Sequence, residues 1–311
     1  MHSVYTTTIT DEARRRGIRI DVIDAQTPIF VLKHAGRRVR CYNALTDQVG
    51  AVTFHLAQDK HLANGFLRRH GLPVPHQIKY TNMAAAREFL RQTGSLVVKP
   101  CREWGGRGVS VAVKTEAELT RAVRRARKYG EDLVLEEFVV GIDFRVIVVG
   151  GRYVAAIERR PAHVLGNGRD NIRRLIIRKN YAMRQVDASC RIPLDAETAR
   201  NLACLGWRYD AVPAGGQRAQ VRLTTNYHTG GEVLDVTDRA PRGLVQAARR
   251  IARLLGVPIL GVDFLADAAG RNYRVVELSP DLAISPPEGA RVAVRFLDHL
   301  FPETRLPAGR A

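Results

Sequence analysis

The segment Leu96–Val111, "LVVKPCREWGGRGVSV", constrains the fold more strongly than any other part of this 311-residue sequence. An apolar run ends at Lys99-Pro100, a glycine-rich turn with added positive charge follows, and a second apolar alternation begins at Val109. In a P-loop the lysine follows the glycines and opens a helix, whereas here it precedes them and the chain returns into a strand. The pattern predicts a hairpin whose strand-end lysine and loop glycines suit phosphate binding. A plain hairpin turn is the alternative.

Composition indicates a soluble globular protein, with 45% apolar and 26% charged residues. No stretch approaches the roughly 18 to 20 apolar residues that a membrane helix needs, which predicts no membrane partner. The N-terminal residues lack the charged-then-apolar pattern of an export signal. The four cysteines, which have no C-x-x-C spacing, are Cys41, Cys101, Cys190 and Cys204. Their spacing argues against a zinc site or a disulfide framework and predicts a cytoplasmic location.

The formal net charge of +18 invites a nucleic-acid interpretation. However, only seven of the 49 basic residues are lysines. Such a strong preference for arginine indicates a general bias in amino-acid composition and not a specific binding patch. The densest cluster, "RAVRRARKYG" at 121–130, is typical of the solvated face of an amphipathic helix. We therefore disfavour a nucleic-acid partner, and expect the positive surface to favour anionic ligands such as nucleotides.

Helices alternate with strand hairpins along the chain, which favours an α+β fold over one doubly wound parallel sheet. The N-terminal part predicts a helix, a strand and a hairpin turning at residues 35–36. Helices are expected at 59–69, 82–93, 115–129 and 242–255, and strands at 95–100, 108–113 and 132–139. Hairpins are expected to turn at Gly150-Gly151 and around Gly270, with an irregular basic segment between them. We predict an N-terminal subdomain at 1–56, subdomains at 57–140 and 141–305, and a tail at 306–311.

Charged residues recur where apolar strands end. Glu136 and Glu137 must point to opposite sides of their strand, so one faces inward and needs a partner such as a lysine or an adenine amino group. Asp143 follows shortly after and is placed to accept hydrogen bonds from ribose hydroxyls. An exposed edge strand is the alternative for Glu137.

The segment "ILGVDFLADAAGRNYRVVELSP" at 259–280 predicts a metal site. A hairpin centred on Gly270 places Asp263 opposite Glu277, with their Cβ atoms about 5 Å apart on one face. Two carboxylates that close repel each other unless a cation lies between them. Ser279 shares this face, and three oxygen ligands suit Mg²⁺ bridging nucleotide phosphates.

Together these motifs resemble the ATP-grasp carboxylate–amine ligases, particularly the group that contains cyanophycin synthetase, fused glutathione synthetase and N-acetylglutaminylglutamine synthetase. The resemblance covers most of the chain, from "LTDQVG" to "RFLDHLFP". Its markers occur in one order: "DK" at 59–60, "VVKP", "GGRGV", "EEFVVGIDFRVIVVGG", "RRPAHVLGNG", "VRLTTNYHTGGEVLDVTD" and "GVDF…VVEL". The resemblance implies an ATP-grasp fold, in which two small α+β subdomains clamp ATP and a short N-terminal subdomain precedes them.

The resemblance also implies roles for individual residues. Phosphate contacts fall on Lys60 and Lys99, the flap over the γ-phosphate on Gly105, Gly106 and Gly108, the adenine contacts on Glu136, Glu137 and Val139, and the ribose contact on Asp143. The acyl-phosphate contacts fall on Arg222 and Asn226, and the ligands of Mg²⁺ or Mn²⁺ on Asp263 and Glu277.

The sequence departs from the family pattern at two positions. Ser279 stands where the family's third metal ligand, an asparagine, is expected. His228 stands at the serine of the family's N-S-T-G-G motif, so that His228, Thr229 and Gly230 are expected to shape the substrate site. A hydrogen-bonded structural histidine is the alternative for His228.

The implied function is an ATP-dependent ligase that forms an amide bond between an amino acid or small peptide and an amine through an acyl phosphate. One alternative is a ligase of the same fold that adds amino acids to a protein terminus. A second is a non-catalytic nucleotide-binding module, and a homo-oligomer is also left open.

Overall fold

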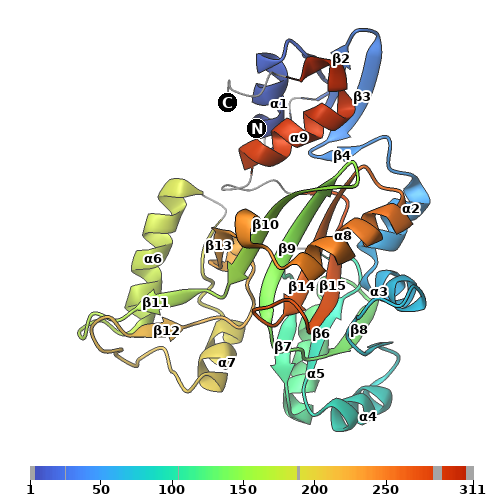
Figure 1. Ribbon diagram of the computed structural model, residues 1–311. Helices are drawn as coiled ribbons and strands as arrows, with labels where there is room; N and C mark the ends of the chain where they lie inside the picture. The colour runs from blue at the N-terminus through green and yellow to red at the C-terminus, as the bar shows by residue number, and fades with distance from the viewer. Residues whose placement is uncertain (1–3, 25, 104, 188–189, 283–288, 306–311) are drawn as a thin grey trace. The chain divides into compact units, whose positions relative to one another are not determined.

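The computed structural model describes residues 4–24, 26–103, 105–187, 190–282 and 289–305. The chain divides into two compact units, each of which combines helices with antiparallel sheets (Figure 1). Unit 1 comprises Met1–Pro75, Val139–Glu158 and Leu234–Ala311, and unit 2 comprises His76–Phe138 and Arg159–Val233. The α+β prediction is confirmed. The subdomain boundaries after residues 56 and 140 stay predictions, and the 306–311 tail lies outside the described residues.

The central sheet of unit 1 has the strand order β13-β10-β9-β14-β15. Its strands are β9 (Ile142–Val149), β10 (Arg152–Arg160), β13 (Glu232–Asp235), β14 (Ile259–Ala266) and β15 (Tyr273–Ser279). The predicted hairpins at Gly150-Gly151 and around Gly270 are confirmed. The predicted helix at 242–255 is α8 (Arg242–Leu255), which packs on β9 and β14 (Figure 1) and buries one apolar stripe. This sheet is therefore the rigid support for the carboxylates at its β14–β15 edge.

A second sheet of unit 1 has the order β1-β2-β3-β4. Its strands are β1 (Arg19–Val22), β2 (Ile29–His34), β3 (Arg37–Tyr42) and β4 (Leu45–Thr46). The predicted N-terminal helix is α1 (Val4–Arg15), which packs against α9 (Gly289–Leu300). Two short helices, α2 (Ala51–Gln58) and α3 (Lys60–Arg69), pack on β15. Asp59 caps the N-terminus of α3 by accepting hydrogen bonds from two backbone N–H groups. The cap therefore determines that Lys60 is the first residue of this helix.

Unit 2 contains a sheet of order β5-β8-β6-β7. Its strands are β5 (Gln77–Lys79), β6 (Leu96–Pro100), β7 (Ser110–Val113) and β8 (Leu133–Glu137). Two helices, α4 (Met83–Thr93) and α5 (Glu116–Ala126), bury their apolar faces in one core with this sheet. The capping box of Thr115 and Glu118 begins α5. The hairpin predicted from the segment 96–111 is confirmed as β6 and β7.

The prediction of an irregular segment after the β9–β10 hairpin is wrong. Unit 2 places there α6 (Ile172–Val186), α7 (Ala196–Cys204), the strand pair β11 (His163–Leu165) and β12 (Arg218–Gln220), and the 3₁₀ turn η1 (Tyr227–Thr229). In α6, only Ile172, Leu175 and Ile176 are buried, so its apolar stripe spans little more than one turn. The buried face of α7 carries polar residues, which hides it from a hydrophobic pattern. Within the described ranges, no helix combines the length and apolar character that crossing a bilayer requires.

We predict that Gly141→Ala destabilises the protein by about 1–3 kcal/mol, the usual cost of overpacking. A Cβ atom at this position would lie 2.8 Å from the backbone nitrogen and 3.0 Å from the backbone oxygen of Ala266, neither of which can move without disturbing β14. The matched control is Gly65→Ala within α3, where a Cβ atom meets nothing within 4 Å. We expect that variant to gain about 0.5–1 kcal/mol from helix propensity. Urea unfolding measures both, and equal midpoints for the two variants would contradict the prediction.

Candidate functional site

The strand-end lysine of the opening segment is buried beside a glutamate. Lys99, 7% exposed, donates to Oε1 of Glu136 at 2.8 Å, and Glu136 is 5% exposed. The register explains the contact: Glu136 lies opposite Val97, two residues before Lys99 on the same face of β6. Gln77 lies opposite Glu136 on β5 and donates to its second oxygen at 2.9 Å. Glu136 is thus the inward-facing residue of the Glu136-Glu137 pair, and its partner is a lysine.

The glycine loop follows β6 directly. Gly105, Gly106 and Gly108 all have φ near +70°, a left-handed conformation that strongly favours glycine. A Cβ atom on Gly108 would meet Pro100 and Tyr129 at 3.0 Å, whereas one on Gly106 would lie 3.7 Å from Cβ of Asn226. The loop therefore lies close to Asn226, for which the family resemblance implies a contact with the acyl phosphate.

The remaining predicted nucleotide contacts lie between the end of β8 and the start of β9. Glu137 and Val139 are partly exposed at and beyond the end of β8. Asp143 is 8% exposed in β9 and lies opposite Leu265 of β14. Their roles toward adenine and ribose stay predictions.

Asp263 lies on β14, an interior strand of the five-stranded sheet of unit 1, next to its edge strand β15. It lies opposite Glu277 on β15, as predicted, and opposite Arg145 on β9. Beyond Asp263 the register shifts, so that Phe264 pairs with Val275 and the predicted pairing does not continue. Arg145 donates to both oxygens of Asp263, at 2.7 and 2.9 Å, and Asp263 is only 1% exposed. A bidentate guanidinium is the strongest neutralising partner that a side chain offers to a buried carboxylate.

Glu277 and Ser279 complete this cluster. The Lys60 Nζ lies 3.3 Å from Oε1 of Glu277, and Arg145 lies 3.4 Å from the Ser279 hydroxyl. The carboxylates were expected to repel each other unless a cation lies between them, but the chain itself supplies two cations. Asp281, which the sequence interpretation missed, follows two residues after Ser279, and burial raises its pKa to about 6.

The donor chemistry of this cluster fits a hard divalent cation. Each oxygen of an ionised carboxylate accepts more than one hydrogen bond or metal contact, so accepting from Arg145 does not by itself prevent Asp263 from binding a metal. Glu277 has a side chain that is 35% exposed, so it is accessible to a ligand. Among the described residues, no three His, Cys, Asp or Glu side chains are grouped closely enough to bind a metal by themselves. A metal here would therefore need further oxygen atoms, from the Ser279 hydroxyl, from a nucleotide or from water.

Arg222 is a buried cation with an unused donor. It is 5% exposed, and its Nη1 donates to the Thr198 hydroxyl at 2.9 Å and lies 3.5 Å from Asp195. Burial lowers the pKa of its guanidinium, which the nearby carboxylates partly oppose. Its Nε is buried without a hydrogen-bond partner among the described residues, and so is the side-chain oxygen of Asn226. Unpaired buried groups of this kind are costly and are typical of sites that bind a ligand.

The predicted substrate residues form the turn that follows Asn226. Thr229 and Gly230 donate backbone hydrogen bonds to Asn226 and Tyr227. Gly230 has φ +88°, and a Cβ atom there would lie 2.4 Å from Ile192, so no other residue fits without rearrangement. The backbone oxygen of His228 accepts from Arg191 N at 3.1 Å, and its ring lies edge-on to that of Tyr227. These contacts fix the turn, and the role of its side chains toward a substrate stays a prediction.

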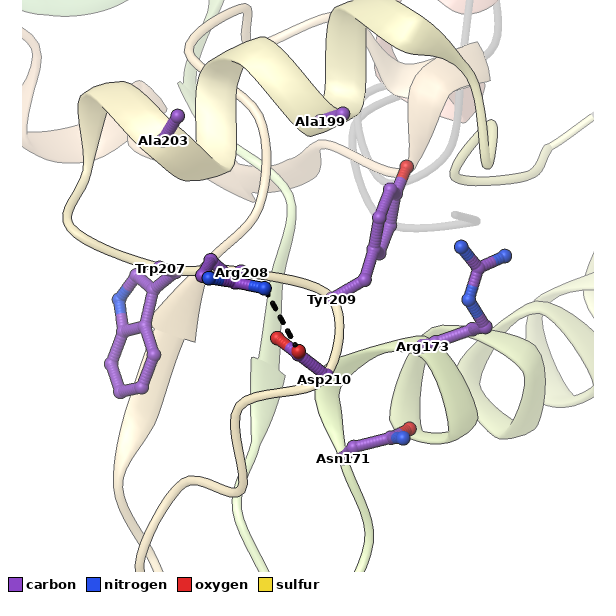
Figure 2. A pocket seen from close by; sticks show the side chains of 8 residues that line it. All are labelled: Asn171, Arg173, Ala199, Ala203, Trp207, Arg208, Tyr209 and Asp210. Carbon is purple, nitrogen blue, oxygen red and sulfur yellow. Dashed lines mark hydrogen bonds and ion pairs between the residues drawn. The ribbon is translucent and has the colours of Figure 1, made fainter.

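A separate surface pocket of about 400 Å³ lies in unit 2 (Figure 2). The Arg173 guanidinium lies 4.6 Å from the centroid of the Tyr209 ring, and Arg208 pairs with Asp210 at 3.2 Å. The other lining residues are Asn171, Ala199, Ala203 and Trp207. None of the predicted site residues lines this pocket.

Comparisons with known proteins agree with the motifs. Residues 72–190 match the model of the prokaryotic glutathione synthetase ATP-grasp domain. Cyanophycin synthetase of Trichormus variabilis is 30% identical over 96% of this chain and 35% of its own length. The glutathione biosynthesis bifunctional protein of Clostridium perfringens is 25% identical over 93% of this chain and 40% of its own length. The chain thus spans little more than a third of the length of these curated relatives.

Solved structures show the same fold. A bifunctional glutathione synthetase from Pasteurella multocida superposes with a TM-score of 0.64, at 22% identity, covering 97% of this chain and 44% of that one. A D-alanine–D-alanine ligase from Bacillus anthracis gives a TM-score of 0.53 at 15% identity, covering 82% of this chain and 70% of that one. The resemblance to the ATP-grasp ligase group is therefore confirmed, and the chain has the ATP-grasp fold.

Proposed function

We propose that this chain is an ATP-dependent carboxylate–amine ligase acting on an amino acid or a small peptide. The single observation that carries the proposal is the buried Arg222 with its unused Nε donor, close in sequence to an unsatisfied oxygen of Asn226. A positive group that is buried and incompletely paired favours an anion, and the acyl phosphate of such a ligase is one. The likeness to cyanophycin synthetase and to the glutathione synthetase ATP-grasp domain supports the same activity.

The reaction has two steps. A substrate carboxylate oxygen attacks the γ-phosphorus of ATP, the bond from that phosphorus to the bridging oxygen breaks, and ADP leaves. The amine nitrogen then attacks the acyl carbon, the bond to the phosphate oxygen breaks, and phosphate leaves while the nitrogen loses a proton. Lys60, Lys99 and the glycine loop hold the phosphates, and Arg222 stabilises the charge that develops on the acyl-phosphate oxygens.

Mg²⁺, or Mn²⁺ in its place, would be held by Asp263 and Glu277, with Ser279 as a further oxygen. When bound, such an ion neutralises phosphate charge and orients the γ-phosphate. Arg145 fixes the orientation of Asp263, and Lys60 lies beside Glu277.

The test of the proposal is phosphate and ADP release from ATP with Mg²⁺, measured against a panel of amino acids and dipeptides as acid and amine. The proposal predicts release that depends on both substrates, with the amide product detected by mass spectrometry. ATP hydrolysis without any dependence on an acid or an amine, or no turnover with any pair, would count against the ligase.

Lys99→Met should weaken ATP binding by about 2–3 kcal/mol, the scale of a lost charge-assisted phosphate contact. This variant also leaves Glu136 buried without its lysine, which costs the fold about 3–5 kcal/mol. Lys99→Met with Glu136→Gln removes the buried charge, so its stability is not lowered by an unpaired carboxylate. Glu136→Gln alone is the control for ATP affinity, because Glu136 is itself an implied adenine contact. We expect the double variant to recover most of the stability but none of the ATP affinity. Calorimetry measures the ATP affinity and urea unfolding the stability of these variants. Wild-type affinity in the double variant would exclude Lys99 as a phosphate contact.

Arg222→Lys should bind ATP nearly normally and turn over more slowly by a factor of about 100 or more, typical for loss of a donor to a developing oxyanion. A lysine keeps the charge but lacks the planar guanidinium and its Nε donor. Steady-state kinetics with separate kcat and KM values check this. A kcat within about twofold of the wild type, far below the usual cost of such a loss, would assign Arg222 a structural role only.

Glu277→Gln should abolish metal-dependent turnover while the fold survives, because amide and carboxylate have nearly the same shape. Glu277 is partly exposed, so its ion pair with Lys60 contributes about 0–1 kcal/mol. We expect a small change in unfolding midpoint and a loss of Mg²⁺ dependence in the ATP titration. A variant that keeps the wild-type Mg²⁺ dependence would remove Glu277 from the metal site.

A further inference from the structure

A buried glutamate of α7 binds two arginines that reach back to the glycine-loop hairpin, all within unit 2. Glu197 is 7% exposed and accepts from Arg200 at 2.8 and 3.1 Å and from Nη1 of Arg125. Burial by itself would raise the pKa of Glu197, but the hydrogen bonds from Arg200 and Arg125 outweigh it and the pKa is lowered. The carboxylate is therefore ionised at neutral pH and is fully engaged with guanidinium groups.

Both arginines also hold the strand that leaves the glycine loop. Arg125 Nη2 donates to the backbone oxygen of Val109 at 2.6 Å and contacts the Ser110 hydroxyl. Arg200 Nη2 donates to the backbone oxygen of Val111 at 2.6 Å. Three consecutive residues after the loop are thereby fixed by side chains from two helices, and Glu197 is the group that joins the two arginines.

The same helix holds the segment that carries Arg222. Thr198, the next residue along α7, accepts from Arg222 at 2.9 Å and donates to the backbone oxygen of Pro193 at 2.6 Å. Asn201 donates to Glu197 at 3.0 Å and accepts from the backbone N–H of Leu223 at 2.7 Å. One short helix therefore contacts the exit strand of the loop directly through Arg200 and indirectly through Glu197 and Arg125. It contacts the Arg222 segment through Thr198 and Asn201.

We propose that Glu197 is a positioning residue that ties the exit strand of the glycine loop to α7, and thereby sets the loop and Arg222 in register with each other. The inference rests on the proposed function for its catalytic consequence, since it assigns the loop to ATP and Arg222 to the acyl phosphate. The contacts themselves do not depend on that function.

The first test measures amide hydrogen exchange of the wild type and Glu197→Gln without nucleotide. Glutamine keeps the shape of glutamate but cannot pair with two guanidinium groups. We expect faster exchange in both 105–113 and 221–223, beyond any change elsewhere in the protein. The matched control is Glu88→Gln on α4, which removes an exposed acid that accepts from Arg91 in the same way. Faster exchange spread evenly over the whole chain, or confined to α7, would overturn the proposal.

The second test is kinetic and separates the inference from the proposed function. In Glu197→Gln we expect KM for ATP to rise and kcat to fall together, each about tenfold, the factor that corresponds to one lost hydrogen bond to a charged group. Glu88→Gln should change neither. If the wild type does not turn over any substrate pair, the proposed function fails while the exchange result still decides the tether. If the wild type is active and Glu197→Gln changes only the unfolding midpoint, the tether has no catalytic role.

Arg200→Lys keeps the test decisive if Glu197→Gln does not fold. A lysine preserves the charge near Glu197 but cannot contact both carboxylate oxygens and the Val111 backbone oxygen at once. We expect the same two segments to exchange faster, with a smaller kinetic change. Wild-type exchange at 105–113 in this variant would show that the guanidinium does not hold the loop.

Discussion

A carboxylate that is 1% exposed in the middle of a sheet must be neutralised, and this requirement organises the β9–β14–β15 region of unit 1. Asp263 meets Arg145 across one neighbouring strand and Glu277 across the other, because β14 pairs antiparallel with both. The positive charge of Arg145 and Lys60 then balances the two acids. The sheet register thus also determines the charge arrangement that a nucleotide–metal complex would meet.

Buried charge follows a different arrangement in unit 2. There the Glu136 carboxylate accepts hydrogen bonds from both Lys99 and Gln77. The Nε donor of Arg222, in contrast, has no partner among the described residues. Lys99 is already paired with Glu136 within the protein. The phosphate contact that we propose for Lys99 would therefore have to form beside this ion pair. Arg222 is incompletely paired and is stabilised by any anion that supplies the missing acceptor. The two cations therefore differ in how completely they are paired, in line with the different tasks that we propose for them: holding the nucleotide phosphates and stabilising the acyl phosphate.

Hairpins could be predicted because glycine turns are local signals in the sequence. The turn around Gly270 made it possible to predict that Asp263 lies opposite Glu277. The bulge beyond Asp263 could not be predicted, because it leaves no signal in the sequence. The helices α6 and α7 could not be predicted, because their buried faces are short or polar and gain stability from distant partners. Arg145 lies 118 residues from Asp263, and Arg125 lies 72 residues from Glu197. A charged residue in an apolar strand, such as Arg145 in "IDFRVIVV", was the only available signal.

The division of unit 1 into three chain segments has a consequence for synthesis on the ribosome. The central pairing of β9 with β14 joins residues 142–149 to 259–266, so β9 is made long before its partner. Unit 2 is complete once residue 233 has emerged, whereas unit 1 still lacks α8, β14, β15 and α9 at that point. Long-range pairing of this kind is slow and exposes apolar strands while it waits. The apolar hairpin of β9 and β10 therefore stays exposed to aggregation in the nascent chain until β14 has been made.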